Sequence, residues 1–150
     1  MAIRKMTFSD LDSAVGLYQY SNLFAKKKDI REWTVRGLRK SPDLNLVYED
    51  DGVIIGAISA ILKGKRIEIN DIAVQEKYRD RNIGTKLMRR LMDILSKEKI
   101  AEISLWVHWP NAAAIPFYYK FGFRIIKCAR TKNIFGVPDG EDIIYLEKII

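Results

Sequence analysis

The chain has 150 residues, of which 48% are hydrophobic and 30% charged. This is the size and composition of one compact domain, so we expect a single domain over residues 1–150. No apolar run is long enough to cross a bilayer, and residues 1–5 lack the apolar stretch of a secretory signal. We therefore expect a cytoplasmic protein without membrane contact.

The chain has one cysteine, Cys128, and one histidine, His108. A single cysteine excludes an intrachain disulfide, and the counts exclude a Cys/His zinc site, so we expect no metal. The net charge of +7 attracts polyanions such as nucleic acid, anionic lipid or a nucleotide cofactor. A solvated, lysine-rich surface is the simpler explanation, so charge alone assigns no partner.

The first half of the chain predicts a short strand from Ile3, two helices and three strands. Ser9 is expected to cap a helix that runs to about Tyr20, and Asp29 a second helix that stops before Pro42. The expected strands flank two turn signals, Asp51-Gly52 and Gly64. They cover residues 44–49, 53–62 and 66–74.

The second half alternates helices and strands. A helix begins near Gly84, with apolar residues at helical spacing on one side. A strand follows at 102–107, and Asn111 is expected to cap a short helix that ends at Gly122. Final strands are expected at 123–128 and 143–148. This mixture predicts an α/β domain built around one sheet.

The segment 72–85 runs from an apolar strand end through a charged loop into an amphipathic helix. A helix N-terminus offers unpaired N–H groups and a partial positive charge, which attract anions. Gly84 allows close backbone approach, and Asn82 tolerates a left-handed conformation. Arg79 and Arg81 add cationic donors. By itself, this segment fits a phosphate-binding loop and an ordinary strand–loop–helix junction equally well.

Two motifs in this sequence resemble those of the GCN5-related N-acetyltransferase (GNAT) family. Arg79-Asp80-Arg81-Asn82-Ile83-Gly84 resembles Arg/Gln-x-x-Gly-x-Gly/Ala, with Asn82 in place of the first glycine, and follows a stretch like the family's fourth strand, Asp71 to Val74. The segment from Asn111 to Phe123 is similar to Asn-x-x-Ala-x-x-x-Tyr-x-x-x-Gly-Phe. The Asn-to-Tyr spacing places both side chains on one helix face.

The resemblance covers residues 66–127 and is specific because both motifs occur in the right order. Within the family, the ribosomal-protein and N-terminal-protein acetyltransferases are loosely the nearest, because their last strand also follows an Asp-Gly-rich loop, here Pro138 to Asp142. The implied fold is the single-domain GNAT fold. It is a mixed, mostly antiparallel sheet with splayed fourth and fifth strands, flanked by helices.

The resemblance implies that acetyl-CoA is the acyl donor and that it binds where those two strands splay. Ile72, Ala73 and Val74 would contact its pantetheine arm through their backbone, and Asn111 would hydrogen-bond to the same arm. The pyrophosphate would be held by the loop and helix start, which are Arg79, Asp80, Arg81, Asn82, Ile83, Gly84 and Thr85.

The implied reaction needs a donor for the thioester oxyanion, an acid for the leaving thiolate and a base for the amine. A backbone N–H near Val74 would supply the first, and the Tyr118 phenol the second. The alternative for Tyr118 is a core aromatic side chain whose hydroxyl has a protein partner.

The base is less defined. Relatives often place the base on the fifth strand, but the corresponding position here is Trp106, whose side chain cannot accept a proton. On the fourth strand the first choice is Glu68, acting through water, on a face that we expect it to share with Asn70 and Ile72. Its alternative is a rim carboxylate paired with Lys or Arg. His108 is the runner-up because its ordinary pKa suits proton transfer, although we expect it at the surface.

The resemblance places the acceptor amine between residues 18–31 and 130–142. Tyr18, Tyr20, Asn22 and Phe24 would line the site, or else pack a helix end, and a loop with Lys132 and Asn133 would close over it. The acceptor would be a protein N-terminus, a lysine or a small amine.

Two other functions compete with acetyl transfer. One is an acyl-CoA-binding regulatory domain without catalysis, which the tryptophan at position 106 allows. The other is a basic nucleic-acid-binding domain, which is disfavoured because the Lys and Arg residues are scattered over most elements. The oligomeric state stays open, and a homodimer is compatible with the sequence.

Overall fold

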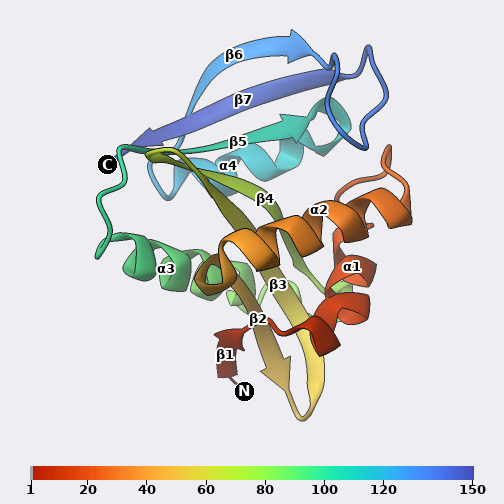
Figure 1. The fold of residues 1–150 in the computed structure, drawn as a ribbon, viewed down its shortest axis with the longest axis vertical. Helices are drawn as coiled ribbons and strands as arrows, with labels where there is room; N and C mark the ends of the chain where they lie inside the picture. Colours follow the sequence, from red (N-terminus) through yellow and green to blue (C-terminus); the bar gives the residue numbers. More distant parts are fainter. Residues whose placement is uncertain (1) are drawn as a thin grey trace.

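The computed structural model describes residues 2–150, and its elements follow the order expected from the sequence (Figure 1). Seven strands form one sheet: β1 (Ala2–Lys5), β2 (Asn45–Asp50), β3 (Val53–Lys63), β4 (Arg66–Val74), β5 (Glu102–His108), β6 (Arg124–Arg130) and β7 (Asp142–Ile149). The α-helices are α1 (Leu11–Tyr18), α2 (Lys27–Lys40), α3 (Ile83–Leu95) and α4 (Ile115–Tyr119). The strand order is β1-β2-β3-β4-β5-β7-β6, and only β4 and β5 are parallel. The expected mixed, mostly antiparallel sheet is confirmed.

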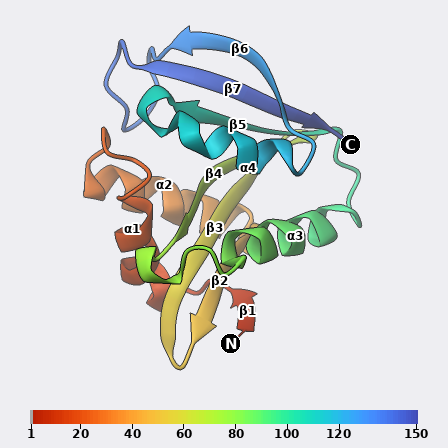
Figure 2. The same cartoon turned by 180° about the vertical axis from the view of Figure 1, so that it is seen from behind.

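Helices cover both faces of the sheet. α1 and α2 lie on one face of β2–β4, whereas α3 lies on the opposite face, next to α4 below β5 (Figures 1 and 2). The α3 side holds the larger core, because Ile83, Leu87 and Leu91 recur every four residues and are all buried against the sheet. No helix within residues 2–150 is long and apolar enough to cross a membrane.

Strands β4 and β5 pair over a short stretch and then separate. Their parallel register runs only from Arg66 opposite Glu102 to Glu68 opposite Ser104. Beyond that point the strands diverge, as Figure 1 shows on its right-hand side. The splay that the sequence resemblance implied is confirmed, and it leaves the β5-facing edge of residues 69–74 without a strand partner.

A β-bulge in β4 reverses the faces on which its side chains lie. Asp71 pairs with Ser59, but Ile69 pairs with the next residue, Ala60, so Asn70 is an extra residue. Before the bulge, Ile69 faces the α3 side; after it, Asp71 contacts the α1–α2 side. The expectation that Glu68, Asn70 and Ile72 share a face is therefore wrong, because strict alternation does not continue across a bulge.

The helix starts differ from those that the sequence predicts. Thr7, rather than Ser9, begins the first helical turn, η1 (Phe8–Asp10), in a capping box with Asp10. α2 begins at Lys27, ahead of the expected cap Asp29. Asn111 caps no helix, because it lies inside the 3₁₀ segment η4 (Trp109–Ala114) with φ −102°.

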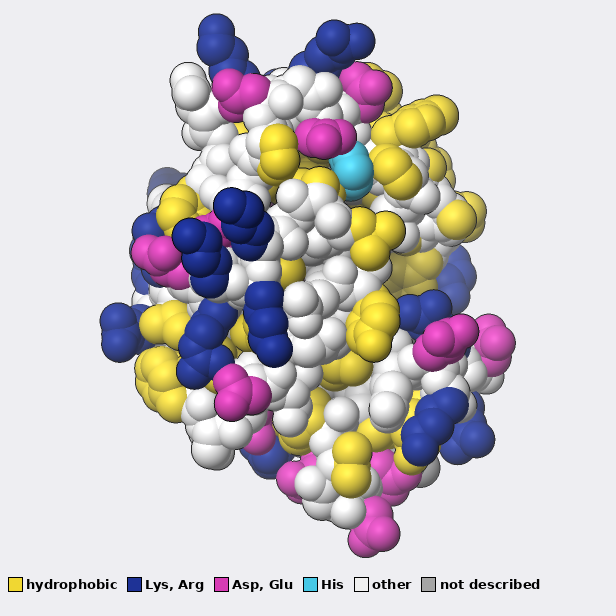
Figure 3. Space-filling model, turned by 90° about the vertical axis from the view of Figure 1, so that its right-hand side faces the viewer, with side chains coloured by type: hydrophobic (Ala, Val, Ile, Leu, Met, Phe, Trp, Pro, Cys, Tyr) yellow, Lys and Arg dark blue, Asp and Glu magenta, His cyan; other side chains and the backbone are white. Residues whose placement is uncertain are grey.

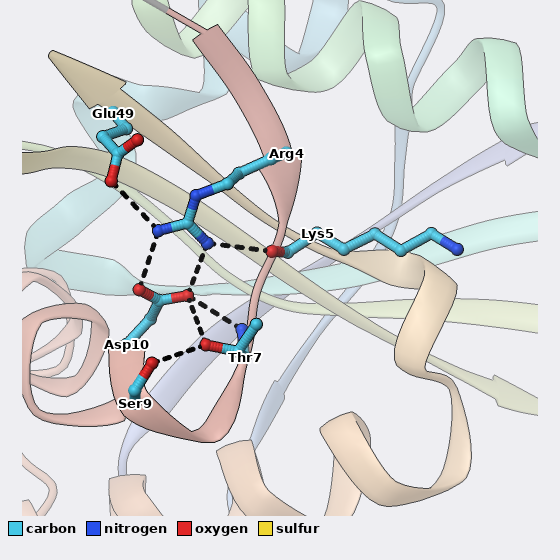
Figure 4. A network of polar contacts seen from close by, with 6 residues as sticks. All are labelled: Arg4, Lys5, Thr7, Ser9, Asp10 and Glu49. Carbon is cyan, nitrogen blue, oxygen red and sulfur yellow. Dashed lines mark hydrogen bonds and ion pairs between the residues drawn. The ribbon is translucent and has the colours of Figure 1, made fainter. Parts of the chain in front are cut away.

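The carboxylate of Asp10 ties the N-terminal strand to the first helical turn (Figure 4). The Arg4 guanidinium donates to both of its oxygens, at 2.8 and 3.0 Å, and Thr7 N donates at 2.8 Å. Arg4 also reaches Glu49 on β2, at 3.2 Å. These donors, Arg4 first, lower the pKa of Asp10, because they stabilise the charged carboxylate against the opposing effect of burial.

We predict that Asp10→Asn lowers the free energy of unfolding by about 1–3 kcal/mol, because it removes a charge-assisted, half-buried pair. A carboxyl whose pKa is lower in the folded than in the unfolded state stabilises the fold at pH values above the unfolded-state pKa. This stabilisation is lost as the pH falls toward the folded-state pKa. The deficit of the variant should therefore shrink as the pH drops below about 4 in urea unfolding.

The matched control is Asp43→Asn, which breaks an ion pair with Lys5 in which both side chains are 66% exposed. It should change the unfolding free energy by less than about 1 kcal/mol. Equal effects of the two substitutions would contradict the role assigned to Asp10.

Candidate active site

A cavity of about 700 Å³ fills the wedge between β4 and β5. Its walls come from β4 and β5, from α4 and η4, from the α1–α2 connection and from the β6–β7 loop. Figure 3 views the side toward which β4 and β5 diverge in Figure 1, and the single histidine lies there between an acidic side chain and hydrophobic ones. Residues far apart in the sequence therefore meet here because two strands separate.

The loop between β4 and α3 presents free backbone amides. Asp80 and Asn82 adopt left-handed conformations, with φ 67° and 60°, so the tolerance expected of Asn82 is used. The first α3 amide with a backbone acceptor is that of Lys86, which donates to Asn82 O at 2.9 Å. The preceding amides, 80–85, have no backbone acceptor within residues 2–150. A run of such groups at a helix start forms an anion-binding concavity.

Gly84 leaves open a part of this surface that a side chain would occupy. An added Cβ would lie 3.6 Å from the Phe117 ring and 3.8 Å from Val74, which are ordinary contacts. Packing within the protein thus does not require glycine here, and Gly84 lines the cavity. Arg79 lies beside it, with its Nε donating to Val74 O at 3.3 Å, and also lines the cavity.

Most of the predicted cofactor-contacting residues meet at the cavity. Those that line it are Ile72, Ala73, Val74, Arg79, Gly84, Asn111 and Tyr118. Asp80, Arg81, Asn82, Ile83 and Thr85 lie on the adjoining loop and first turn, outside the lining itself. Arg81 stacks over the Tyr78 ring, at 5.3 Å from its centroid. Ile83 points into the α3 core instead, so only its backbone faces the loop.

Tyr118 is 9% exposed and lines the cavity from α4. Its ring packs edge-on against Phe117, at 5.4 Å, and against Phe123, at 6.0 Å. Its hydroxyl has no hydrogen-bond partner within the described chain, unlike that of a typical core tyrosine. Burial, and then the nearby Asp71, raise the pKa of Tyr118, so the phenol stays protonated in neutral solution.

The two residues first considered as bases both have polar side-chain partners. Glu68 lines the cavity and forms an ion pair with Lys63, at 3.1 Å. His108 Nε2 lies 2.9 Å from Glu141 Oε2. Its side chain is only 12% exposed, because Phe24 from the α1–α2 connection packs on the ring at 4.3 Å. The expectation of a surface position for His108 is therefore wrong.

Sequence reasoning missed Asp71, which lines the cavity and is 5% exposed. Asn22 Nδ2 donates to one carboxylate oxygen, and Trp33 Nε1 donates to the other at 2.7 Å. Burial raises the pKa of Asp71 to about 7, against the opposing effect of these two donors. The sequence signal for Asp71 was an acidic residue inside an apolar strand. The bulge that turns its side chain toward the α1–α2 side has no sequence signature.

The acceptor side of the cavity is lined by Tyr20, Asn22 and Phe24, as expected. Tyr18 is not part of it, because it is fully buried and its hydroxyl lies 2.6 Å from Ser59 Oγ. From the β6–β7 loop the lining residues are Ile134, Phe135 and Val137, rather than Lys132 and Asn133.

The β6–β7 loop is docked on α2. The Arg36 guanidinium lies 4.3 Å above the Phe135 ring. Gly136 has φ 77° and approaches Trp33 so closely that an added Cβ would lie 3.0 Å from its ring. Trp33 therefore connects this loop to the buried Asp71.

The described residues 2–150 hold no cluster of three or more His, Cys, Asp or Glu side chains suited to a metal ion. The groups that line or adjoin the wedge include the phenol of Tyr118, the buried carboxylate of Asp71 and the row of free amides at 80–85.

This combination defines the acyltransferase class whose sheet opens between its fourth and fifth strands. A family model described as "Acetyltransferase (GNAT) family" matches residues 7–123, most of the chain. The chain belongs to the GNAT family of acetyltransferases.

Known relatives agree with this membership. An uncharacterized N-acetyltransferase of Methanocaldococcus jannaschii is 33% identical in an alignment of 134 residues that covers 81% of this chain and 59% of that longer protein. Ard1 of Thermoplasma volcanium superimposes with a TM-score of 0.83 at 22% identity, covering 99% of this chain and 97% of that one. Arabidopsis thaliana Naa50, in complex with the bisubstrate analogue CoA-Ac-MVNAL, superimposes with a TM-score of 0.79 at 23% identity, covering 99% of this chain and 98% of that one. These structures show the same fold.

We predict that Asp71 makes stability fall as pH rises. Its carboxyl keeps a proton up to about pH 7 when folded but only to about pH 4 when unfolded. Between these values the folded state binds more protons, so the contribution of this group is lost as pH increases. The difference in unfolding free energy between the wild type and Asp71→Asn should therefore decrease from about pH 4 to about pH 7 and then level off.

Urea unfolding at several pH values measures this difference. Asp142→Asn is the matched control, because that carboxylate is 65% exposed and pairs with Arg130, and its effect should vary little over the same range. A difference for Asp71→Asn that does not change with pH would show that the buried carboxyl does not titrate near neutrality.

Proposed function

We propose that this protein transfers the acetyl group of acetyl-CoA directly to a primary amine, on a protein N-terminus, a lysine or a small molecule. The observation that carries this proposal is the wedge itself, with free amides at its mouth and an unpartnered phenol in its wall. Naa50 binds an analogue that joins CoA to a peptide, which supports a peptide N-terminus as one acceptor for this chain.

The residues present fit acetyl-CoA along the whole wedge. The amides of 80–85 and the side chain of Arg79 would hold the pyrophosphate. The edge of Ile72, Ala73 and Val74 that β5 does not pair with would hydrogen-bond to the pantetheine arm in the manner of an added strand. Asn111, which lines the opposite wall, would donate to the same arm.

Tyr118 would act on the leaving sulfur. Its raised pKa keeps the proton on the phenol before reaction, and its free hydroxyl can donate to the thiolate as the carbon–sulfur bond breaks. A raised phenol pKa also makes full proton transfer less favourable, so the hydrogen bond to developing negative charge is the larger part of its contribution. Glu68 remains a proposed base that would act through water, from its ion pair with Lys63.

We predict that Tyr118→Phe lowers kcat by about 10²–10⁴-fold, because general acid assistance is lost, while the Kd for acetyl-CoA changes little. Initial rates with a panel of peptides and polyamines measure the first quantity, and calorimetry the second. Tyr119→Phe is the matched control. Tyr119 is the next residue in the chain, but it is exposed, and its hydroxyl accepts a hydrogen bond from Ile125 N.

Full turnover by Tyr118→Phe would remove it from the reaction. A wild-type protein that binds acetyl-CoA but acetylates no amine in the panel would favour the alternative function, an acyl-CoA-binding regulatory domain.

We predict that Gly84→Val weakens acetyl-CoA binding by at least about tenfold, a cost of about 1.4 kcal/mol. Its branched side chain would fill the surface between Phe117 and Val74 that the glycine leaves open. Gly16→Val is the matched control, because an added Cβ at this α1 position meets nothing within 4 Å. Unchanged affinity in a folded Gly84→Val protein would contradict the placement of the cofactor.

A further inference from the structure

We infer that Asp71 forms the ammonium subsite of the acceptor: it binds the protonated amine and accepts its first proton, with Asn22 and Trp33 holding the carboxylate in position. This inference rests on the proposed acetyl transfer. It names the group that receives the acceptor, which neither the motifs nor the relatives assign.

The partners of Asp71 set it apart from the other carboxylates near the wedge. Glu68 pairs with Lys63, Glu141 with His108, and the buried Asp10 with Arg4. Asp71 instead has only two neutral donors, Asn22 and Trp33, and no cationic side chain within residues 2–150 pairs with it. A buried carboxylate without a cation is costly, and it is usually paired when it is found. The missing cation fits a substrate ammonium group.

The geometry leaves room for that ammonium. A carboxylate offers about four lone-pair positions, and each oxygen of Asp71 accepts one protein bond. The residue also lines the cavity, whose walls include aromatic side chains from three elements: Phe24, Trp33 and Trp106. Aromatic faces attract cations as well as excluding water, so this end of the cavity suits an alkylammonium.

Asp71 also lies on the face of the sheet, and on the side of the cavity, where the acceptor is expected. The bulge at Asn70 turns it toward the α1–α2 connection, where the acceptor site was expected, whereas the amides of 80–85 lie beyond the other end of the cavity-lining strand. Tyr118 lines the same cavity as Asp71. The proton acceptor and the proposed acid therefore face the same reacting region.

The proton balance is complete without any further reactant. The R–NH₃⁺ group gives one proton to the Asp71 carboxylate and becomes a neutral amine. Its nitrogen then attacks the thioester carbon, the C–N bond forms and the C–S bond breaks with its electron pair on sulfur. As the phenol of Tyr118 gives its proton to the sulfur, the second proton of the nitrogen passes to the Tyr118 oxygen, so the phenol is regenerated and the thiol leaves. Asp71 returns its proton to water when the products leave.

Other charged and titratable groups line the cavity or interact with the charge of Asp71, and their effects must be separated from its own in any pH profile. They are Tyr18 from α1, Tyr20 from the α1–α2 connection, Arg36 from α2, Lys63 from β3, Glu68 from β4, Arg79 from the β4–α3 loop, His108 from β5 and Tyr118 from α4. Of these, Glu68 and His108 are the other candidate bases. Glu68 pairs with Lys63, and His108 Nε2 lies 2.9 Å from Glu141 Oε2.

The first experiment compares Asp71→Asn with Glu68→Gln in the full chain, using acetyl-CoA and an amine that the wild type acetylates. We expect Asp71→Asn to lower kcat/KM at pH 7.5 by about 10²–10⁴-fold, with an unchanged Kd for acetyl-CoA. Its rate should recover at alkaline pH, where the amine loses its proton in solution. The matched control is Asp43→Asn, at an exposed carboxylate paired with Lys5, which should stay within about threefold of wild type, less than 1 kcal/mol. Glu68→Gln, at the competing candidate base, should lose less activity than Asp71→Asn.

The second experiment uses Trp33→Phe, which keeps an aromatic ring but removes one donor that stabilises the charged carboxylate. The midpoint of the acidic limb of the pH–rate profile should move to higher pH than in the wild type. A merely structural role of Trp33 would lower the rate or the melting temperature and leave the midpoint in place.

Near-wild-type turnover by a folded Asp71→Asn protein, or a large loss in Glu68→Gln alone, would overturn the assignment to Asp71 and leave the proposed acetyl transfer intact. A wild type that acetylates no amine would overturn both. Tight acetyl-CoA binding by that protein would then distinguish a failed acceptor assignment from a misread cofactor site.

Discussion

The separation of β4 from β5 is the constraint from which the rest of the site follows. Parallel strands normally satisfy each other's amides and carbonyls along their whole length, but here the pairing ends after Glu68 and Ser104. From there on, the edge of β4 has hydrogen-bonding groups without a strand partner, and a cavity replaces the missing ladder. Backbone groups that are left unpaired beside a cavity are costly unless a ligand or water satisfies them, so the sheet is built to receive an extended molecule.

The two ends of this cavity carry opposite electrostatic features. At one end, the left-handed Asp80 and Asn82 and the start of α3 direct free amides toward an anion. At the other end, Asp71 is a buried acid with neutral partners only. A thioester cofactor with a diphosphate and an acceptor with an ammonium group complement these two features. Tyr118 lines the same cavity from α4.

The loops that close the acceptor end are joined to the same carboxylate. Trp33 donates to Asp71 while its ring supports Gly136 of the β6–β7 loop, and Arg36, one helical turn further on, covers Phe135. Phe24 closes the side toward β5 by packing on His108. The environment that raises the pKa of Asp71 is thus maintained by α2 and two connections, and none of these is adjacent to it in the sequence.

Local sequence patterns were sufficient for the order and type of the elements, for the left-handed Asn82 and for both motif segments. Each depends on neighbours within about two helical turns: apolar spacing in α3, turn residues at Asp51-Gly52, and the backbone tolerance of Asn82. The helix caps were less predictable, because Ser9, Asp29 and Asn111 are all plausible caps by residue type. The observed starts depend on contacts with other strands, such as the bond from Arg4 to Asp10.

The sequence alone thus determined the family, the loop at 79–85 with its left-handed Asn82 and the candidacy of Tyr118, because these depend on short motifs with fixed local geometry. Only the tertiary structure decided which carboxylate faces the cavity without a counterion. One extra residue at Asn70 reverses the alternation of β4 and turns Asp71 toward Asn22 and Trp33, while Glu68 is left with Lys63. A bulge is a property of the pairing between two strands, so no spacing rule applied to β4 alone could have revealed it.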